Sequence, residues 1–123
     1  MPPDPRKSLE DIRHAAALIA KFVNGRTFDD YRADEMLHAA IERELMIVGE
    51  AMTRLSKTAP ELTDQFPERR QIIAFRNILV HGYDIVDDAV VWDIIQNHLP
   101  LLVKRLDEAS APKTDGKRRK AEA

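Results

Sequence analysis

The sequence predicts an all-α protein, an up-and-down bundle of four main helices plus a short connecting helix. Apolar residues recur every three or four positions over long segments, which is the spacing of one buried helix face. Glycine or proline separates these segments at Gly25, Pro60 and Gly82. Apolar residues make up 44% of the chain and charged residues 33%, a balance that suits a charge-rich helical domain with a core of its own.

Capping residues and periodicity predict the first two helices. Ser8 can cap a first helix that ends near Gly25. Thr27 or Asp29 opens the second and longest helix, which we expect to run to about Lys57. Its apolar seam suits packing against another helix or a helical dimer interface, and consists of Leu37, Ile41, Leu45, Val48, Met52 and Leu55.

Gly49 interrupts this seam. Glycine inside a helix costs about 1 kcal/mol relative to alanine, so it needs a reason to be there. The usual reason is the close approach of another backbone, and we expect one at Gly49. Its neighbour Glu50 is an ordinary solvated helix residue on this evidence alone.

The break at Pro60 leaves residues 61–66 as a short turn or a few helical residues. Pro67 suits the first position of a third major helix, because its missing N–H would have no partner there in any case. Gly82 is the expected end of that helix.

Asp87 or Asp88 can cap a last helix, in which Pro100 should produce a kink because its ring clashes with the preceding turn. We therefore divide the chain into a loose N-terminus (residues 1–7), one helical domain (residues 8–109) and a disordered basic tail (residues 110–123).

Charge is unevenly distributed along the chain. Five basic and two acidic residues follow Ser110, so the tail carries +3, whereas the preceding part carries 14 basic and 19 acidic residues, or −5. An acidic body argues against broad binding of nucleic acid, which depends on neutralising phosphates. Any RNA should therefore meet a local basic cleft.

Several classes of site are disfavoured. The chain has no cysteine, which excludes disulfides and thiolate metal sites. His14, His38 and His98 show no metal-ligand spacing, so we expect surface or packing roles for them, no metal and no cofactor. No apolar run approaches the length of a membrane span, and the N-terminus lacks a signal-peptide core, so we expect a cytoplasmic protein without a membrane partner.

The candidate site is residues 76–83, where Arg76, Asn77, His81 and Tyr83 lie among aliphatic residues. Histidine exchanges a proton near neutral pH, and arginine offers a planar fork of donors to a phosphate or phosphorane. A base and a fixed cation are sufficient to cleave RNA without a metal, through attack of the ribose 2′-OH on the adjacent phosphorus. Asn77 would hold Arg76 or His81 in place, or donate to a phosphate oxygen.

Helix geometry does not bring Arg76 and His81 together directly. At 100° per residue the two positions diverge by about 140° on a straight helix. Either the helix loosens near Gly82, or the pair converges in a cleft shared with a second subunit. We expect a homodimer.

The spacing of Arg76, His81 and Tyr83 resembles the motif of the HEPN ribonucleases, and in particular the HepT-type toxins. The resemblance extends to residues 48–51 (Val-Gly-Glu-Ala), residues 28–31, residues 91–92 and residues 98–102. It covers roughly residues 9–106.

This resemblance implies the toxin of a type II toxin–antitoxin module, an RNA-cleaving homodimer with its motif helices at the interface. It implies catalytic roles for Arg76 and His81 and an orienting role for Glu50 toward Arg76. It also implies that an MNT-type nucleotidyltransferase antitoxin attaches adenylate to Tyr83. The alternative is a noncatalytic helical partner that binds nucleotide for a nucleotidyltransferase.

Overall fold

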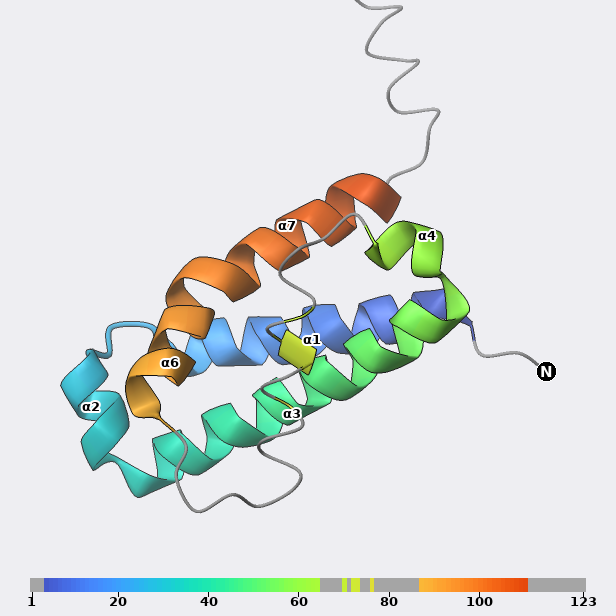
Figure 1. Ribbon diagram of the computed structural model, residues 1–123. Helices are drawn as coiled ribbons and strands as arrows, with labels where there is room; N and C mark the ends of the chain where they lie inside the picture. The colour runs from blue at the N-terminus through green and yellow to red at the C-terminus, as the bar shows by residue number, and fades with distance from the viewer. Residues whose placement is uncertain (1–3, 65–69, 71, 74–75, 77–86, 111–123) are drawn as a thin grey trace, which may run out of the picture.

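The computed structural model describes residues 4–64, 70, 72–73, 76 and 87–110, and every regular element in that part is helical (Figure 1). The predicted all-α class is therefore confirmed. Of the predicted disordered tail, residues 110–123, Ser110 is instead the last residue of a helix, and residues 111–123 lie outside the described residues.

Helix α1 spans Pro5–Val23 and begins earlier than predicted. Asp4, not Ser8, is its N-cap: the Asp4 side chain accepts a hydrogen bond from the Arg6 N–H, and Pro5 fits the first helical position. Ser8 is buried inside the helix. Residues 5–7, assigned to a loose N-terminus, thus form part of its first two turns. Gly25 follows the helix with φ +74°, a left-handed conformation that glycine adopts without strain.

The predicted second helix is in fact two helices, α2 (Phe28–Ala33) and α3 (Glu35–Thr58). Thr27 caps α2 in a reciprocal capping box with Asp30, which confirms one of the two predicted starts. The break falls at Asp34, whose backbone is extended and whose side chain accepts a hydrogen bond from the Leu37 N–H. Asp34 thus ends one helix and caps the next.

Short elements lie on either side of the candidate motif. The break before Pro60 is confirmed, and α4 spans Pro60–Thr63. After the motif, Asp87 caps α6 (Asp88–Asp93) by accepting a hydrogen bond from the Ala89 N–H, as predicted.

The last predicted helix contains an irregularity just before Pro100. A π-helical turn, η1 (Ile94–His98), separates α6 from α7 (Leu99–Ser110), and the Leu99 N–H donates to the Ile94 carbonyl. Proline has no N–H and its ring crowds the preceding turn, so the wider turn accommodates it. The chain changes direction between α6 and α7 (Figure 1).

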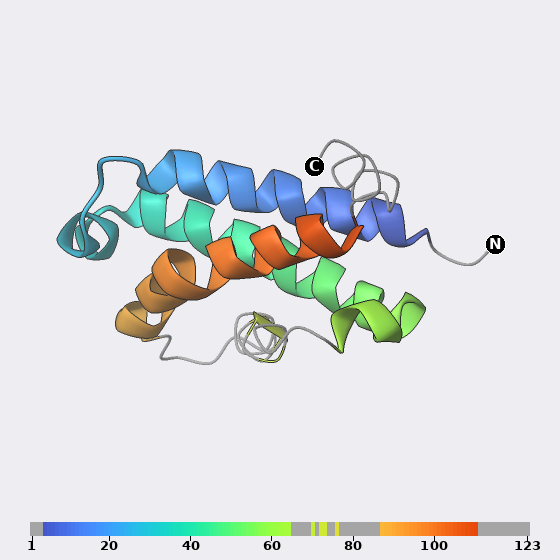
Figure 2. The same ribbon diagram turned by 90° about the horizontal axis from the view of Figure 1, so that it is seen from above.

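The core forms where α1 packs along α3 and α7 lies against α1 (Figure 2). The largest side chains within it are fully buried and come from all three helices and their neighbours, among them Ile12, Ile19, Ile41, Leu45, Met52, Leu55, Ile72, Leu102 and Leu106. Each such side chain contributes roughly 1.5–3 kcal/mol of burial free energy. Among the residues described, no helix is both long enough and apolar enough to cross a membrane.

The close approach expected at Gly49 is confirmed. Arg70, Ile72, Ile73 and Arg76 are helical. A Cβ atom built on Gly49 would overlap the Arg76 Cβ, lie 2.6 Å from its Cγ and lie 3.3 Å from the Ile72 carbonyl oxygen. Glycine at this position therefore brings the motif-bearing backbone onto α3.

We predict that Gly49→Ala destabilises the protein. Helix propensity alone would make alanine more stable by about 1 kcal/mol. The added methyl group must instead push the Arg76 backbone away, and overpacking of this kind costs typically 1–3 kcal/mol. Urea unfolding followed by circular dichroism gives the sign directly. A Gly49→Ala protein that is more stable than the parent would show that the two helices do not meet here.

Tyr31 generates a second prediction. It is fully buried, and its hydroxyl has no hydrogen-bond partner in the described part of the chain. Tyr31→Phe should therefore be as stable as the parent or about 1 kcal/mol more stable, because an unpaired buried hydroxyl is costly. Tyr31→Ala should lose about 3–5 kcal/mol, since it leaves a cavity.

The same tyrosine predicts a pH dependence. Burial raises the pKa of the Tyr31 hydroxyl above its usual 10.0, and the charges of Asp88 and Glu42 add to that effect. The raised value favours the neutral form in the folded state, so this contribution is complete below about pH 10 and is lost as the pH rises further. The stability of Tyr31→Phe relative to the parent should therefore increase above pH 10 in urea titrations. An unchanged difference across that range would contradict the burial.

Candidate functional site

The structure describes two of the five predicted site residues, Arg76 and Glu50. Asn77, His81 and Tyr83 lie outside the described residues, and their roles stay predictions. The described part of the site is therefore the contact of Ile72 and Arg76 with α3.

The aliphatic part of the Arg76 side chain packs against α3. The side chain is half-buried, and its Cβ and Cγ lie directly over Gly49 of α3. Ile72, one helical turn earlier, is 2% exposed and places its carbonyl oxygen near the same glycine. Residues four apart share one helix face, so Ile72 anchors the turn that carries Arg76. The arginine stem thus starts from a fixed position.

Glu50 follows Gly49 on α3 and is also half-buried. It makes no hydrogen bond or ion pair with the described residues, and one helical step turns it by about 100° from the Gly49 direction. An orienting role toward Arg76 stays a prediction. One turn after Gly49, the Thr53 hydroxyl donates to the Gly49 carbonyl at 2.9 Å, so the proton of this hydroxyl is already engaged in a hydrogen bond.

The remaining histidines occupy surface or packing positions, as predicted. His14 is exposed on α1. His98 lies 3.1 Å from Asp93, whose carboxyl pKa is lowered by hydrogen bonds from Asn97 and His98. His38 lies on α3 and contacts Asp88 of α6. Within the described ranges, no three histidine or carboxylate side chains cluster as a metal site would require.

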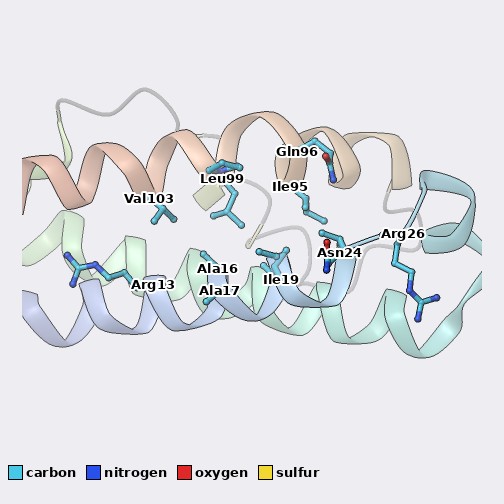
Figure 3. A pocket seen from close by; sticks show the side chains of 14 residues that line it. Arg13, Ala16, Ala17, Ile19, Asn24, Arg26, Ile95, Gln96, Leu99 and Val103 are labelled. Carbon is cyan, nitrogen blue, oxygen red and sulfur yellow. The ribbon is translucent and has the colours of Figure 1, made fainter.

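A cavity of about 640 Å³ opens elsewhere, between α1, η1 and α7 (Figure 3). Its wall is mostly small and aliphatic, with Arg13 and Arg26 as its charged residues and no carboxylate or histidine. Such a wall can bind apolar groups but supplies no side chain that transfers protons near neutral pH. Neither of the two described site residues, Glu50 and Arg76, lines it.

One contact near the site was not predicted. His38 lies 2.6 Å from Asp88, a residue 50 positions later in the sequence. The spacing of His38 and Glu42 places both on one helix face, and that was the one signal available in the sequence. Nothing local indicates that α6 would add a second carboxylate.

Comparison with known proteins supports the family resemblance. The family model described as ribonuclease HepT-like matches residues 12–109. "Putative RNase TTE0752" of Caldanaerobacter subterraneus is 33% identical over 104 residues, which cover 85% of this chain and 92% of that protein. "Probable ribonuclease HepT" of Thermococcus cleftensis is 31% identical over 100 residues, which cover 81% of this chain and 90% of that protein. No solved structure matches significantly.

These matches span most of the chain. The chain therefore belongs to the HepT-like ribonuclease family.

Proposed function

We propose that this protein is a metal-independent endoribonuclease in which Arg76 and His81 are the catalytic residues. The observation that carries the proposal is the seating of the Arg76 stem on Gly49. A cation fixed in advance stabilises developing charge without reorganising during the reaction, and this is often the largest single contribution to catalysis.

The reaction follows from the two side chains. Neutral His81 removes the proton from a ribose 2′-OH, and the oxygen attacks the adjacent phosphorus. Arg76 donates to the equatorial oxygens of the phosphorane that forms. The bond to the 5′-oxygen then breaks, and that oxygen takes up a proton, which leaves a 2′,3′-cyclic phosphate and a free 5′-OH. DNA lacks the 2′-OH and is spared.

Two residues support this pair in the proposal. Asn77 holds Arg76 or His81, or donates to a phosphate oxygen. Glu50 lies one position beyond the contact glycine on α3 and orients the arginine when RNA is bound. Both roles belong to the bound state.

A homodimer completes the cleft in this proposal. Arg76 and a residue five positions later diverge by about 140° on a straight helix, so one helix does not simply present both groups to one phosphate. Pairing the motif helices of two subunits supplies the missing side of the cleft.

The biological setting we propose is the toxin of a type II toxin–antitoxin module. Its antitoxin is an MNT-type nucleotidyltransferase that adenylylates Tyr83. Bulk and negative charge two residues from His81 would fill the cleft and compete with RNA for Arg76.

A second candidate function is a noncatalytic partner that binds nucleotide for such a transferase. The acidic body favours it, since residues 1–110 carry −5 and a protein partner needs no polyanion-binding surface. The two functions differ in whether the unmodified protein cleaves RNA.

We predict that purified protein cleaves RNA in the presence of a chelator and leaves 2′,3′-cyclic phosphate ends. His81→Ala should lower kcat by about 10²–10⁴-fold, the usual contribution of general acid–base catalysis. Arg76→Ala should lower it by about 10²–10³-fold, as expected for loss of a charge-stabilising donor. Gel assays with end analysis measure both, after intact mass shows that Tyr83 carries no adenylate.

His98→Ala is the matched control. His98 is a half-buried histidine on η1 that pairs with Asp93 of α6, and its substitution should leave kcat unchanged. Unmodified protein that cleaves none of several RNA classes would favour the noncatalytic partner. Equal activity of the parent and both site variants would assign the cleavage to a contaminant.

A further inference from the structure

His38 is clamped between carboxylates from two different helices. Its Nε2 lies 2.6 Å from the Asp88 Oδ1 at the start of α6, and its Nδ1 lies 3.5 Å from the Glu42 Oε1 on α3. The short contact to Asp88 joins two elements 50 positions apart in the sequence.

The imidazole is also fixed in its plane. Tyr31 of α2 stacks on it with ring centroids 4.7 Å apart and an interplanar angle of 18°. Tyr31 in turn packs against Trp92 of α6 at 5.7 Å. Asp88 and His38 are about 30% and 27% exposed, so solvent screens their contact only in part.

This cluster is not a metal site. The two ring nitrogens face different carboxylates on opposite edges of the imidazole, so one ion could not meet all three groups. The cluster is also not needed to attach α6 to the core, because buried Val91 and the aromatic contacts of Trp92 already do so. The His38–Asp88 contact adds orientation at the first residue of α6.

The orientation of Asp88 matters because Asp88 follows the candidate motif closely in the sequence. Asp88 comes seven residues after His81 and five after Tyr83. At the other end of the motif, Arg76 rests on Gly49. Both described flanks of the motif are therefore attached to α3, at points 11 residues or about 16 Å apart along the helix.

We infer that His38 and Asp88 are a positioning pair for the proposed ribonuclease site. They fix where the chain re-enters the scaffold after the motif, and so help to set His81 and Tyr83 relative to Arg76. Neither residue touches RNA in this inference, whose catalytic consequence rests on the proposed function. Misplacing a reacting group by about 1 Å can cost about 100-fold in rate, so loosening the His38–Asp88 contact should lower kcat.

The test compares His38→Ala, His38→Gln and Asp88→Asn with the parent as full-length protein. We expect His38→Ala to lower kcat by about 10–100-fold with KM nearly unchanged. His38→Gln should recover most of the rate, because the glutamine amide can donate to Asp88 from nearly the position of Nε2. His98→Ala is the matched control, another half-buried histidine paired with an aspartate.

A second measurement does not depend on activity. Amide hydrogen exchange read by mass spectrometry should be faster in peptides covering residues 77–86 of His38→Ala and Asp88→Asn, with the α1 and α3 peptides unchanged. His38→Gln and His98→Ala should exchange like the parent.

The outcomes separate this inference from the proposed function. If the parent cleaves RNA and His38→Ala matches it in kcat and in exchange, the positioning role is wrong. Faster exchange throughout the chain would also overturn it, because His38 would then only stabilise the fold. If the parent cleaves no RNA, the proposed function fails, and local exchange at residues 77–86 alone decides whether the pair anchors that segment.

Discussion

The candidate site depends on one close contact, the seating of Arg76 on Gly49. A backbone can approach α3 this closely only where the side chain is a hydrogen atom, since a Cβ would overlap the Arg76 stem. Ile72 joins the core one turn before the arginine, so apolar burial holds the same face that carries the cation. Core packing of Ile72 thereby fixes where the Arg76 side chain leaves the backbone.

That arrangement has a cost, which bears on function. Half-burial of a guanidinium removes part of its hydration, and an aliphatic residue would fill the space over Gly49 without this penalty. The remaining core is assembled from α1, α2, α3, α6, η1 and α7, and needs no charge at position 76. In the proposed function the guanidinium has a role that an aliphatic residue could not fill, because it donates to an RNA phosphate.

Local chemistry decided which features could be predicted from the sequence. Thr27 and Asp87 were each one of two predicted caps, because their hydrogen bonds reach only two or three residues ahead. Gly49 was predictable because glycine is costly in a helix. The break at Asp34 was missed, since apolar periodicity continues through it and only the extended backbone reveals it. The His38–Asp88 contact was equally hidden, because it depends on how distant helices pack.

The distribution of charge limits how RNA can be held. Many cations of the described surface already face carboxylates, as in the pairs Arg13–Asp107, Arg54–Asp11 and Lys7–Asp11, and the body is acidic overall. Such a surface offers little general attraction to a polyanion, whose non-specific binding grows with the number of phosphates neutralised. In the proposed function, affinity for RNA then comes from a few cations near Arg76. A single added negative charge there, such as adenylate on Tyr83, would remove a large fraction of it, whereas the same charge on a broadly basic protein would matter little.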